Sequence, residues 1–206
     1  MKAVLRWLGW VILAFVALQL FFVLRIAAMA AINPESTTFQ RSEAWGVAQN
    51  TGAMKWHQQW VPYAQISDHL KRAIIASEDA SFIVHEGVDM DALEKAWERN
   101  AKAQAKAQAT AQVPAAKVRG GSTITQQLAK NLLLSGERTL LRKGQEFVLT
   151  LLLEQLLPKQ RILEIYLNSV EWGEGVFGAE AAAQHYYRKS AAQLAPAEAA
   201  RLAVML

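Results

Sequence analysis

The chain has 206 residues, of which 52% are hydrophobic and none is cysteine. At roughly 100–200 residues per domain, this length allows one folded domain with an appendage. The lack of cysteine excludes disulfides, thiolate metal sites and cysteine nucleophiles. The four histidines, at positions 57, 69, 85 and 185, never have the H-x-x-x-H spacing of a zinc-protease helix.

The net charge of +4 comes largely from the N-terminus. Lys2, Arg6 and Arg25 face no acid within residues 1–32, whereas the rest of the chain carries 19 basic and 18 acidic residues. This distribution does not indicate a nucleic-acid-binding protein, so no nucleic-acid partner is expected. One local excess remains, because residues 117–143 hold six basic residues and a single acid.

Residues 7–32 are predicted to form a transmembrane anchor. Residues 7–24 contain no charge, and Gln19 is the one strongly polar residue among them. The positive-inside rule keeps residues 1–6 in the cytoplasm and exports the rest of the chain. A cleaved signal peptide is the alternative, because the A-M-A tripeptide at 28–30 resembles a cleavage site. The apolar core exceeds the usual length of such peptides, which favours an uncleaved anchor.

The remainder is predicted to be mainly α-helical, because it contains almost no alternation of apolar and polar residues. Residues 33–59 are interpreted as a linker and lead-in, and residues 60–206 as the folded domain. Asp68 resembles the N-cap of a helix that runs to about Glu78. Residues 89–109 are also helix-prone, although the Ala/Lys/Gln tract at 101–111 offers no packing face.

Further helices are predicted toward the C-terminus, starting after the breaker Gly120-Gly121. Thr123 to Gln126 fits a capping box, which begins a helix through Leu134. Helices are expected at 142–157, 159–168, 179–188 and 196–206, with a loop at glycines 173, 175 and 178. Since the last helix has no cap at Leu206, we expect the natural protein to continue.

Four segments carry groups suited to chemistry. Glu78 and Asp79 end an amphipathic helix, where apolar packing favours a general base, and a solvated acidic helix end is the alternative. His85 follows them, either as a functional group or as an ordinary hydrogen-bonded histidine. Residues 120–127 read G-G-S-T-I-T-Q-Q, and a glycine turn before a helix N-terminus favours an anion. Gln126 and Lys130 are four residues apart and share a face of this helix.

The third and fourth segments contain carboxylates in helices. Glu146 is spaced for ion pairs with Arg142 and Lys143 but enters an almost wholly apolar helix, where a carboxylate needs a specific reason. Glu164 and Asn168 share a face of the following helix. A binding role and a structural brace are equally compatible with that spacing.

Taken in this order, the segments resemble the peptidoglycan glycosyltransferase family (glycosyltransferase family 51). The family motifs are E-D-x-x-F-x-x-H-x-G, G-G-S-T-I-T-Q-Q, R-K-x-x-E and a K-x-x-I-L-E-x-Y-L-N helix. Here they stand at Glu78-Asp79 with Phe82, His85 and Gly87, at 120–127, at 142–146 and at 159–168. The resemblance covers about residues 60–206, and the short anchored architecture is similar to monofunctional members in Gram-negative bacteria. The tract at 101–111 lengthens the stretch between the first two motifs.

The resemblance implies a mainly α, lysozyme-like glycosyltransferase domain that polymerises lipid II into glycan strands. It implies that Glu78 is the general base on the acceptor 4-hydroxyl and Glu146 a second essential carboxylate at the donor site. Lys130 and Arg138 match the cations that hold the donor diphosphate. The other donor-side matches are polar residues of the second motif and its helix: Ser122, Gln126, Gln127 and Asn131.

The residues themselves agree with that chemistry. A glycosidase needs a carboxylic acid to protonate a poor leaving group, whereas a lipid-linked sugar leaves as a diphosphate whose developing charge needs cations. Lys130, Arg138, Arg142 and Lys143 supply them, and Glu78 supplies the base. The sequence therefore predicts a single displacement with inversion. No cofactor and no protein metal site is required, although a divalent cation (Mg²⁺ or Mn²⁺) is allowed as an assistant on the diphosphate.

The expected partners are lipid II, the growing glycan strand, inner-membrane lipid and other cell-wall synthesis proteins. The expected location is the bacterial inner membrane, with a single span and a periplasmic catalytic domain. Three alternatives stay open: a lysozyme-like lytic enzyme, the N-terminal part of a bifunctional class A penicillin-binding protein, and a membrane-anchored scaffold. No transpeptidase motif is present in this chain.

Overall fold

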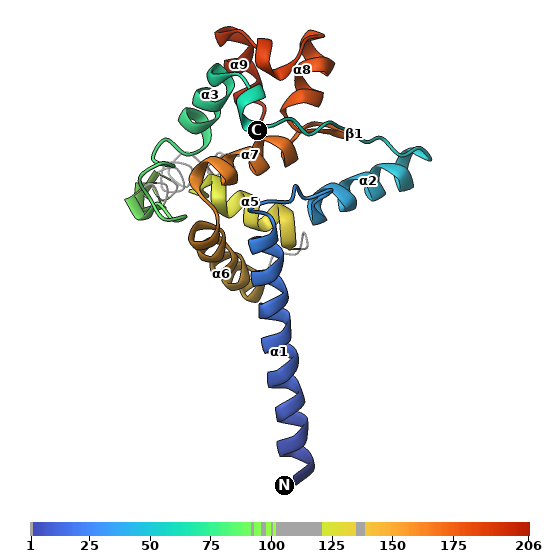
Figure 1. Ribbon diagram of the computed structural model, residues 1–206, viewed down its shortest axis with the longest axis vertical. Helices are drawn as coiled ribbons and strands as arrows, with labels where there is room; N and C mark the ends of the chain where they lie inside the picture. Colours follow the sequence, from blue (N-terminus) through green and yellow to red (C-terminus); the bar gives the residue numbers. More distant parts are fainter. Residues whose placement is uncertain (1, 92, 96–97, 100, 102–120, 135–138) are drawn as a thin grey trace, which may run out of the picture.

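A computed structural model describes the chain apart from residues 1, 92, 96–97, 100, 102–120 and 135–138, and it is mostly helical (Figure 1). The mainly α fold predicted from the sequence is therefore confirmed. A long helix, α1 (Lys2–Ala28), projects from the folded part. The other helices are α2 (Thr38–Thr51), α3 (Asp68–Glu78), α5 (Ile124–Leu133), α6 (Leu140–Leu156), α7 (Lys159–Ser169), α8 (Ala179–Tyr187) and α9 (Pro196–Ala203).

The chain also contains two short 3₁₀ helices, η1 (Tyr63–Gln65) and η2 (Ala191–Gln193). The described residues between 90 and 101 are also helical, as expected. The Ala/Lys/Gln tract lies outside the described residues except for its first member.

A small sheet occupies part of the glycine segment that was predicted to be a loop. Strands β2 (Glu171–Gly173) and β3 (Val176–Phe177) pair antiparallel, and β1 (His57–Gln58) pairs parallel with β3. The strand order is β1-β3-β2. The expectation of a loop was wrong here because strands of two or three residues are too short to show an alternating pattern.

The segment interpreted as a linker contains α2, which is a correction. Thr37 and Gln40 form a reciprocal capping box at its start. The Gln40 side-chain amide donates to the Ser169 carbonyl at 3.0 Å, and the Thr38 hydroxyl donates to the Leu132 carbonyl at 3.1 Å. These contacts with distant residues dock α2 on the domain, and the mixed composition of the segment gave no sign of them.

Local capping signals placed most helix starts correctly. The capping box of Thr123 and Gln126 is present, and α5 begins at Ile124. The cap of α3 is Ser67, whose hydroxyl oxygen accepts from the His69 N–H at 3.3 Å. Asp68 is therefore the first residue of the helix and not its cap.

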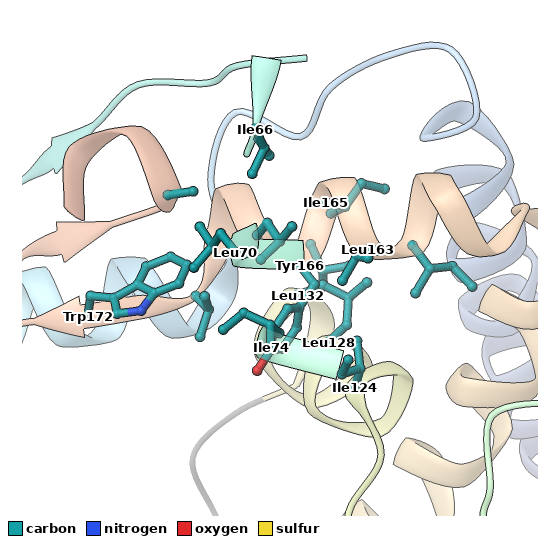
Figure 2. Close-up of a cluster of buried hydrophobic side chains, with 14 of the residues drawn as sticks. Ile66, Leu70, Ile74, Ile124, Leu128, Leu132, Leu163, Ile165, Tyr166 and Trp172 are labelled. Atoms are coloured by element: carbon teal, nitrogen blue, oxygen red, sulfur yellow. The ribbon is translucent and has the colours of Figure 1, made fainter. Parts of the chain in front are cut away.

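The hydrophobic core gathers around α7 (Figure 2). Leu70 and Ile74 of α3 and Leu128 and Leu132 of α5 are at most 1% exposed, and Tyr166 of α7 lies among them. Burying one such side chain stabilises the fold by about 1.5–3 kcal/mol. Helices α3, α5 and α7, which carry three of the four motifs, are thus fixed against one another.

Helix α1 is the one helix among the described residues that is long and apolar enough to cross a membrane. Its last turns enter the core, since Phe22 and Ile26 are buried. Just beyond it, Arg161 of α7 donates to the Met29 carbonyl at 2.7 Å and to the Asn33 side chain at 2.8 Å. The domain therefore holds the end of α1 through side-chain hydrogen bonds as well as packing.

Candidate active site

Glu78 lies at the C-terminal end of α3, half-buried, and contacts α5. Its Oε2 accepts a hydrogen bond from Gln127 Nε2 at 2.9 Å. The Gln127 Oε1 in turn accepts from the Tyr166 hydroxyl at 3.0 Å. Burial first, and then the charges of Glu78 and Asp79, raise the pKa of Tyr166 far above its usual value. The predicted base is therefore the end of a hydrogen-bonded chain that crosses three helices.

Asp79 is buried and braces the turn that follows Glu78. Its two carboxylate oxygens lie 2.8 and 3.0 Å from His85 Nε2. The Gly87 N–H donates to His85 Nδ1 at 3.0 Å, so the His85 proton is on Nε2 and faces Asp79. This is the ordinary hydrogen-bonded histidine that the sequence left as one alternative.

The same Asp79 carboxylate also binds the N-terminus of α5, where the sequence favoured a ligand anion. Its Oδ2 accepts from the Ile124 N–H, the first of α5, at 3.0 Å. The Gln126 N–H donates to the Thr123 hydroxyl oxygen at 3.1 Å. Backbone donors that were expected to bind a ligand anion are thus bonded within the protein. The N–H groups of Thr123, Ile124 and Gln126 are therefore not free to bind an anion, whereas cationic side chains form stronger hydrogen bonds to one.

Other members of the first two motifs are structural. Phe82 is fully buried, with Lys159 Nζ 4.5 Å from its ring centre. Gly87 has φ +88°, and an added Cβ would lie 2.7 Å from Thr150 Cγ2 of α6. The Gly87 carbonyl accepts from the Thr123 hydroxyl at 2.6 Å. Only glycine lets the turn approach both α5 and α6 this closely.

The predicted donor-side residues differ in their exposure and in their hydrogen bonds. Gln126 uses its Oε1 to accept from the Thr123 N–H at 3.1 Å, as the capping box requires. Lys130 is exposed, whereas Asn131 is buried and its Oδ1 has no partner among the described residues. Gly121 and Ser122 are half-buried. Two members of the predicted site, Gly120 and Arg138, lie outside the described residues.

Glu146 of α6 is buried at 4% exposure and is paired twice. Arg142 Nη1 lies 2.9 Å from its Oε2, and Lys143 Nζ forms an ion pair with its Oε1. Arg142 is partly buried and its Nε has no partner in the described part of the chain. The helical spacing therefore forms the ion pairs that the sequence predicted. Since α5 packs on α6 and bonds to Glu78, it connects the two carboxylates.

Glu164 and Asn168 act as a brace. The Asn168 side chain accepts from the Val61 N–H at 2.9 Å and donates to the Val61 carbonyl at 3.0 Å. Glu164 accepts from the Tyr63 N–H at 3.3 Å and pairs with Arg161 at 3.1 Å. Both residues therefore hold the segment before α3 on α7. Between the two alternatives left by the sequence, the contacts are those of a brace.

Sequence reasoning missed a second carboxylate in α6, whose side chain is 6% exposed. Glu154 accepts from the Thr125 hydroxyl at 2.5 Å and pairs with Lys159 at 2.8 Å. It thereby ties α5 and the start of α7 to α6. Its place in an apolar run was the available signal. Tyr166 was also given no role, although it stands inside the fourth motif.

Within the described residues, no three His, Asp or Glu side chains gather as a metal site.

Comparisons with known proteins agree with this arrangement. The sequence model of a family described as "Transglycosylase" matches residues 46–206. A protein of Cupriavidus pinatubonensis named biosynthetic peptidoglycan transglycosylase is 54% identical over 210 residues, covering 98% of this chain and 78% of its own length. A protein of the same name from Herminiimonas arsenicoxydans is also 54% identical, covering 100% and 86%. A third, from Burkholderia multivorans, is 54% identical and covers 94% and 74%.

Proposed function

Because the chain belongs to the transglycosylase family and is a peptidoglycan glycosyltransferase, we propose that it polymerises lipid II into β-1,4-linked glycan strands. The lipid product is undecaprenyl diphosphate. The observation that carries the proposal is the unequal environment of two carboxylates. Glu78 is half-buried with a neutral amide donor, while Glu146 is buried between cations.

Glu78 is the general base in this proposal. Its Oε2 is bonded to the Gln127 amide, so Oε1 is the atom assigned to take the proton of the acceptor 4-hydroxyl. A carboxylate with a neutral donor remains able to accept a proton. Asp79 is committed to His85 and Ile124 and is not assigned that role.

The cations act on the leaving group. Lys130 is exposed on α5 and Lys143 is exposed on α6. Arg138 remains a proposed diphosphate ligand from its sequence position alone. Glu146 holds Arg142 and Lys143 in place, and we assign it to the donor side for that reason. Ser122, Gln126, Gln127 and Asn131 stay proposed donor contacts.

The reaction is a single displacement. The acceptor 4-oxygen forms a bond to the donor anomeric carbon while its proton passes to Glu78. The bond between that carbon and the diphosphate oxygen breaks, and the electron pair leaves with the diphosphate. Attack from the opposite face converts an α-linked donor into a β-linked product. A divalent cation would assist by binding the diphosphate.

The apolar helix α1 supports a membrane location, which we assign to the inner membrane with the catalytic domain in the periplasm. The Gln145 side-chain amide of α6 donates to Gln19 Oε1 of α1 at 3.4 Å. Helix α6 also leaves large apolar side chains exposed: Leu140, Leu141, Phe147, Val148 and Leu151. We propose that this face of α6 lies against lipid, where it would bring the site to a lipid-linked donor.

The test is polymerisation of fluorescent lipid II by the detergent-solubilised full-length protein. We expect a ladder of strands that added lysozyme clears, and no ladder from Glu78→Gln. The matched control is Glu174→Gln. It removes an exposed carboxylate that is paired with Lys55 and is distant in sequence from Glu78. Clearing of isolated cell-wall sacculi without any ladder would instead establish the lytic alternative.

A further inference from the structure

We propose that Tyr166 is a positioning residue whose hydroxyl orients the Gln127 amide so that an N–H faces Glu78. The chain runs from the Tyr166 hydroxyl to Gln127 Oε1 at 3.0 Å and from Gln127 Nε2 to Glu78 Oε2 at 2.9 Å. This inference rests on the proposed role of Glu78 as the base. It adds a residue from α7 that does not itself contact the reacting atoms.

The position of the Tyr166 hydroxyl is set by packing. The residue is 1% exposed and lies among Ile74, Leu128 and Leu132 (Figure 2). A ring held on all sides cannot swing away from Gln127. A buried phenol also needs a hydrogen-bond partner, since an unpaired one costs about 1–3 kcal/mol. Gln127 Oε1 supplies that partner, so the core imposes the distance between α7 and the amide.

The direction of the first hydrogen bond follows from the state of the phenol. Burial and the charges of Glu78 and Asp79 raise the pKa of Tyr166, so the group stays protonated. Its O–H then donates, and the amide must offer its carbonyl oxygen. The NH₂ group is left to face Glu78. Ionised Glu78 favours the same orientation, because the opposite one would place a carbonyl against a carboxylate.

Many of the charged groups on the surrounding elements are engaged with each other, whereas Arg72 of α3 and Arg201 of α9 are exposed. Asp79 is bonded to His85 after α3, Lys159 and Arg161 of α7 pair with Glu154 and Glu164, and Glu198 of α9 pairs with Lys189. On α5 the nearest cation in sequence is Lys130, which is exposed. The Gln127 amide is therefore the neutral donor through which Tyr166 acts on Glu78.

Removing the phenol frees the amide to rotate. In Tyr166→Phe the carbonyl of Gln127 loses its donor, and the flipped amide can accept from a protonated Glu78. A hydrogen bond to the charged carboxylate is thus exchanged for one to the neutral acid. We expect the acidic limb of the pH–rate profile to move to higher pH by about one unit. At pH values below the limb, the rate should therefore fall about tenfold. At the alkaline plateau the rate should change little.

The experiment measures the pH profile of lipid II polymerisation for Tyr166→Phe, Gln127→Leu and the double variant. If Tyr166 acts only through Gln127, both single changes shift the limb and Tyr166→Phe adds nothing on the Gln127→Leu background. The matched control is Tyr186→Phe, which removes a phenol bonded to the Trp172 carbonyl at 2.8 Å. Its profile should coincide with that of the unchanged protein.

Thermal unfolding of each variant separates positioning from stability. If Tyr166→Phe does not fold, a Gln127→Leu profile without a shift still overturns the proposal, because the amide is the group through which Tyr166 would act on Glu78. A limb that stays in place in the folded variants, while Glu78→Gln is inactive, overturns the positioning role alone. Full activity of Glu78→Gln would instead overturn the proposed base itself.

Discussion

The two carboxylates of the candidate site are held in opposite ways. Glu78 stands at the end of α3, half-buried, with one neutral amide on Oε2. Glu146 lies inside α6, buried, with a guanidinium on one oxygen and an ammonium on the other. The two cations commit Glu146 to ion pairs, whereas the amide partner of Glu78 is neutral. The comparison teaches that identical side chains receive different tasks from their neighbours.

The largest expected effect is the loss of activity in Glu78→Gln. Glu78→Gln keeps the hydrogen-bonding shape of the side chain but removes the base, so the rate of polymerisation should fall by about 10²–10⁴-fold. The melting temperature should change little, because the carboxylate has a single, neutral partner among the described residues. Initial rates with lipid II and a thermal melt check both points. An active Glu78→Gln protein would remove the distinction between the two carboxylates.

Glu146→Gln should affect stability as well as rate. It leaves Arg142 and Lys143 without their shared carboxylate, and loss of one partner of a buried pair costs about 3 kcal/mol. Lys143 is exposed and regains water, so the actual cost should lie below that value. Chemical denaturation measures the free energy of unfolding.

A double variant then separates the two effects of Glu146. Removing the orphaned guanidinium with Arg142→Gln in the Glu146→Gln background should restore part of the stability. Activity should stay low if Glu146 serves to hold cations at the diphosphate. Recovery of activity together with stability would show that the pair is only structural.

Gly87→Ala tests the brace beside Glu78. The residue has φ +88°, and its new Cβ would meet Thr150 and Glu154 of α6 at 2.7 and 2.9 Å. Positive φ alone costs a non-glycine residue about 1 kcal/mol or more, and the clash adds to it, so we expect about 2 kcal/mol of destabilisation. Gly52→Ala is a matched control, because φ is +72° there but nothing lies within 4 Å of the new Cβ.

The smallest expected effect is that of Asp79→Asn. The amide can still accept from the Ile124 N–H, but it loses the negative charge that faces His85 Nε2. We expect about 1.5 kcal/mol of destabilisation, the lower end of the range for a hydrogen bond to a charged group. Because Asp79 is not the proposed base, Asp79→Asn should lower the rate of polymerisation far less than Glu78→Gln does. Equal rate losses for Asp79→Asn and Glu78→Gln would contradict the assignment of Glu78, and not Asp79, as the base.

Sequence alone fixed the features that depend on neighbouring residues. The Thr123 capping box, the ion pairs of Glu146 at helical spacing and the long apolar α1 were all predicted, and all are present. The order of the motifs also identified the family. The first three signals need only residues within one or two helical turns or a stretch of uniform polarity, and the motif order is read along the chain, so no tertiary knowledge was required.

Tertiary structure decided the contacts between residues far apart in the chain. Gln127 meets Glu78 across 49 residues, Tyr166 meets Gln127 across 39, and Asn168 meets Val61 across 107. The occupation of the α5 N-terminus by Asp79 and the docking of α2 are of the same kind. Spacing along one helix shows which face a side chain is on, but the partner on that face depends on how α3, α5 and α7 pack around a shared core.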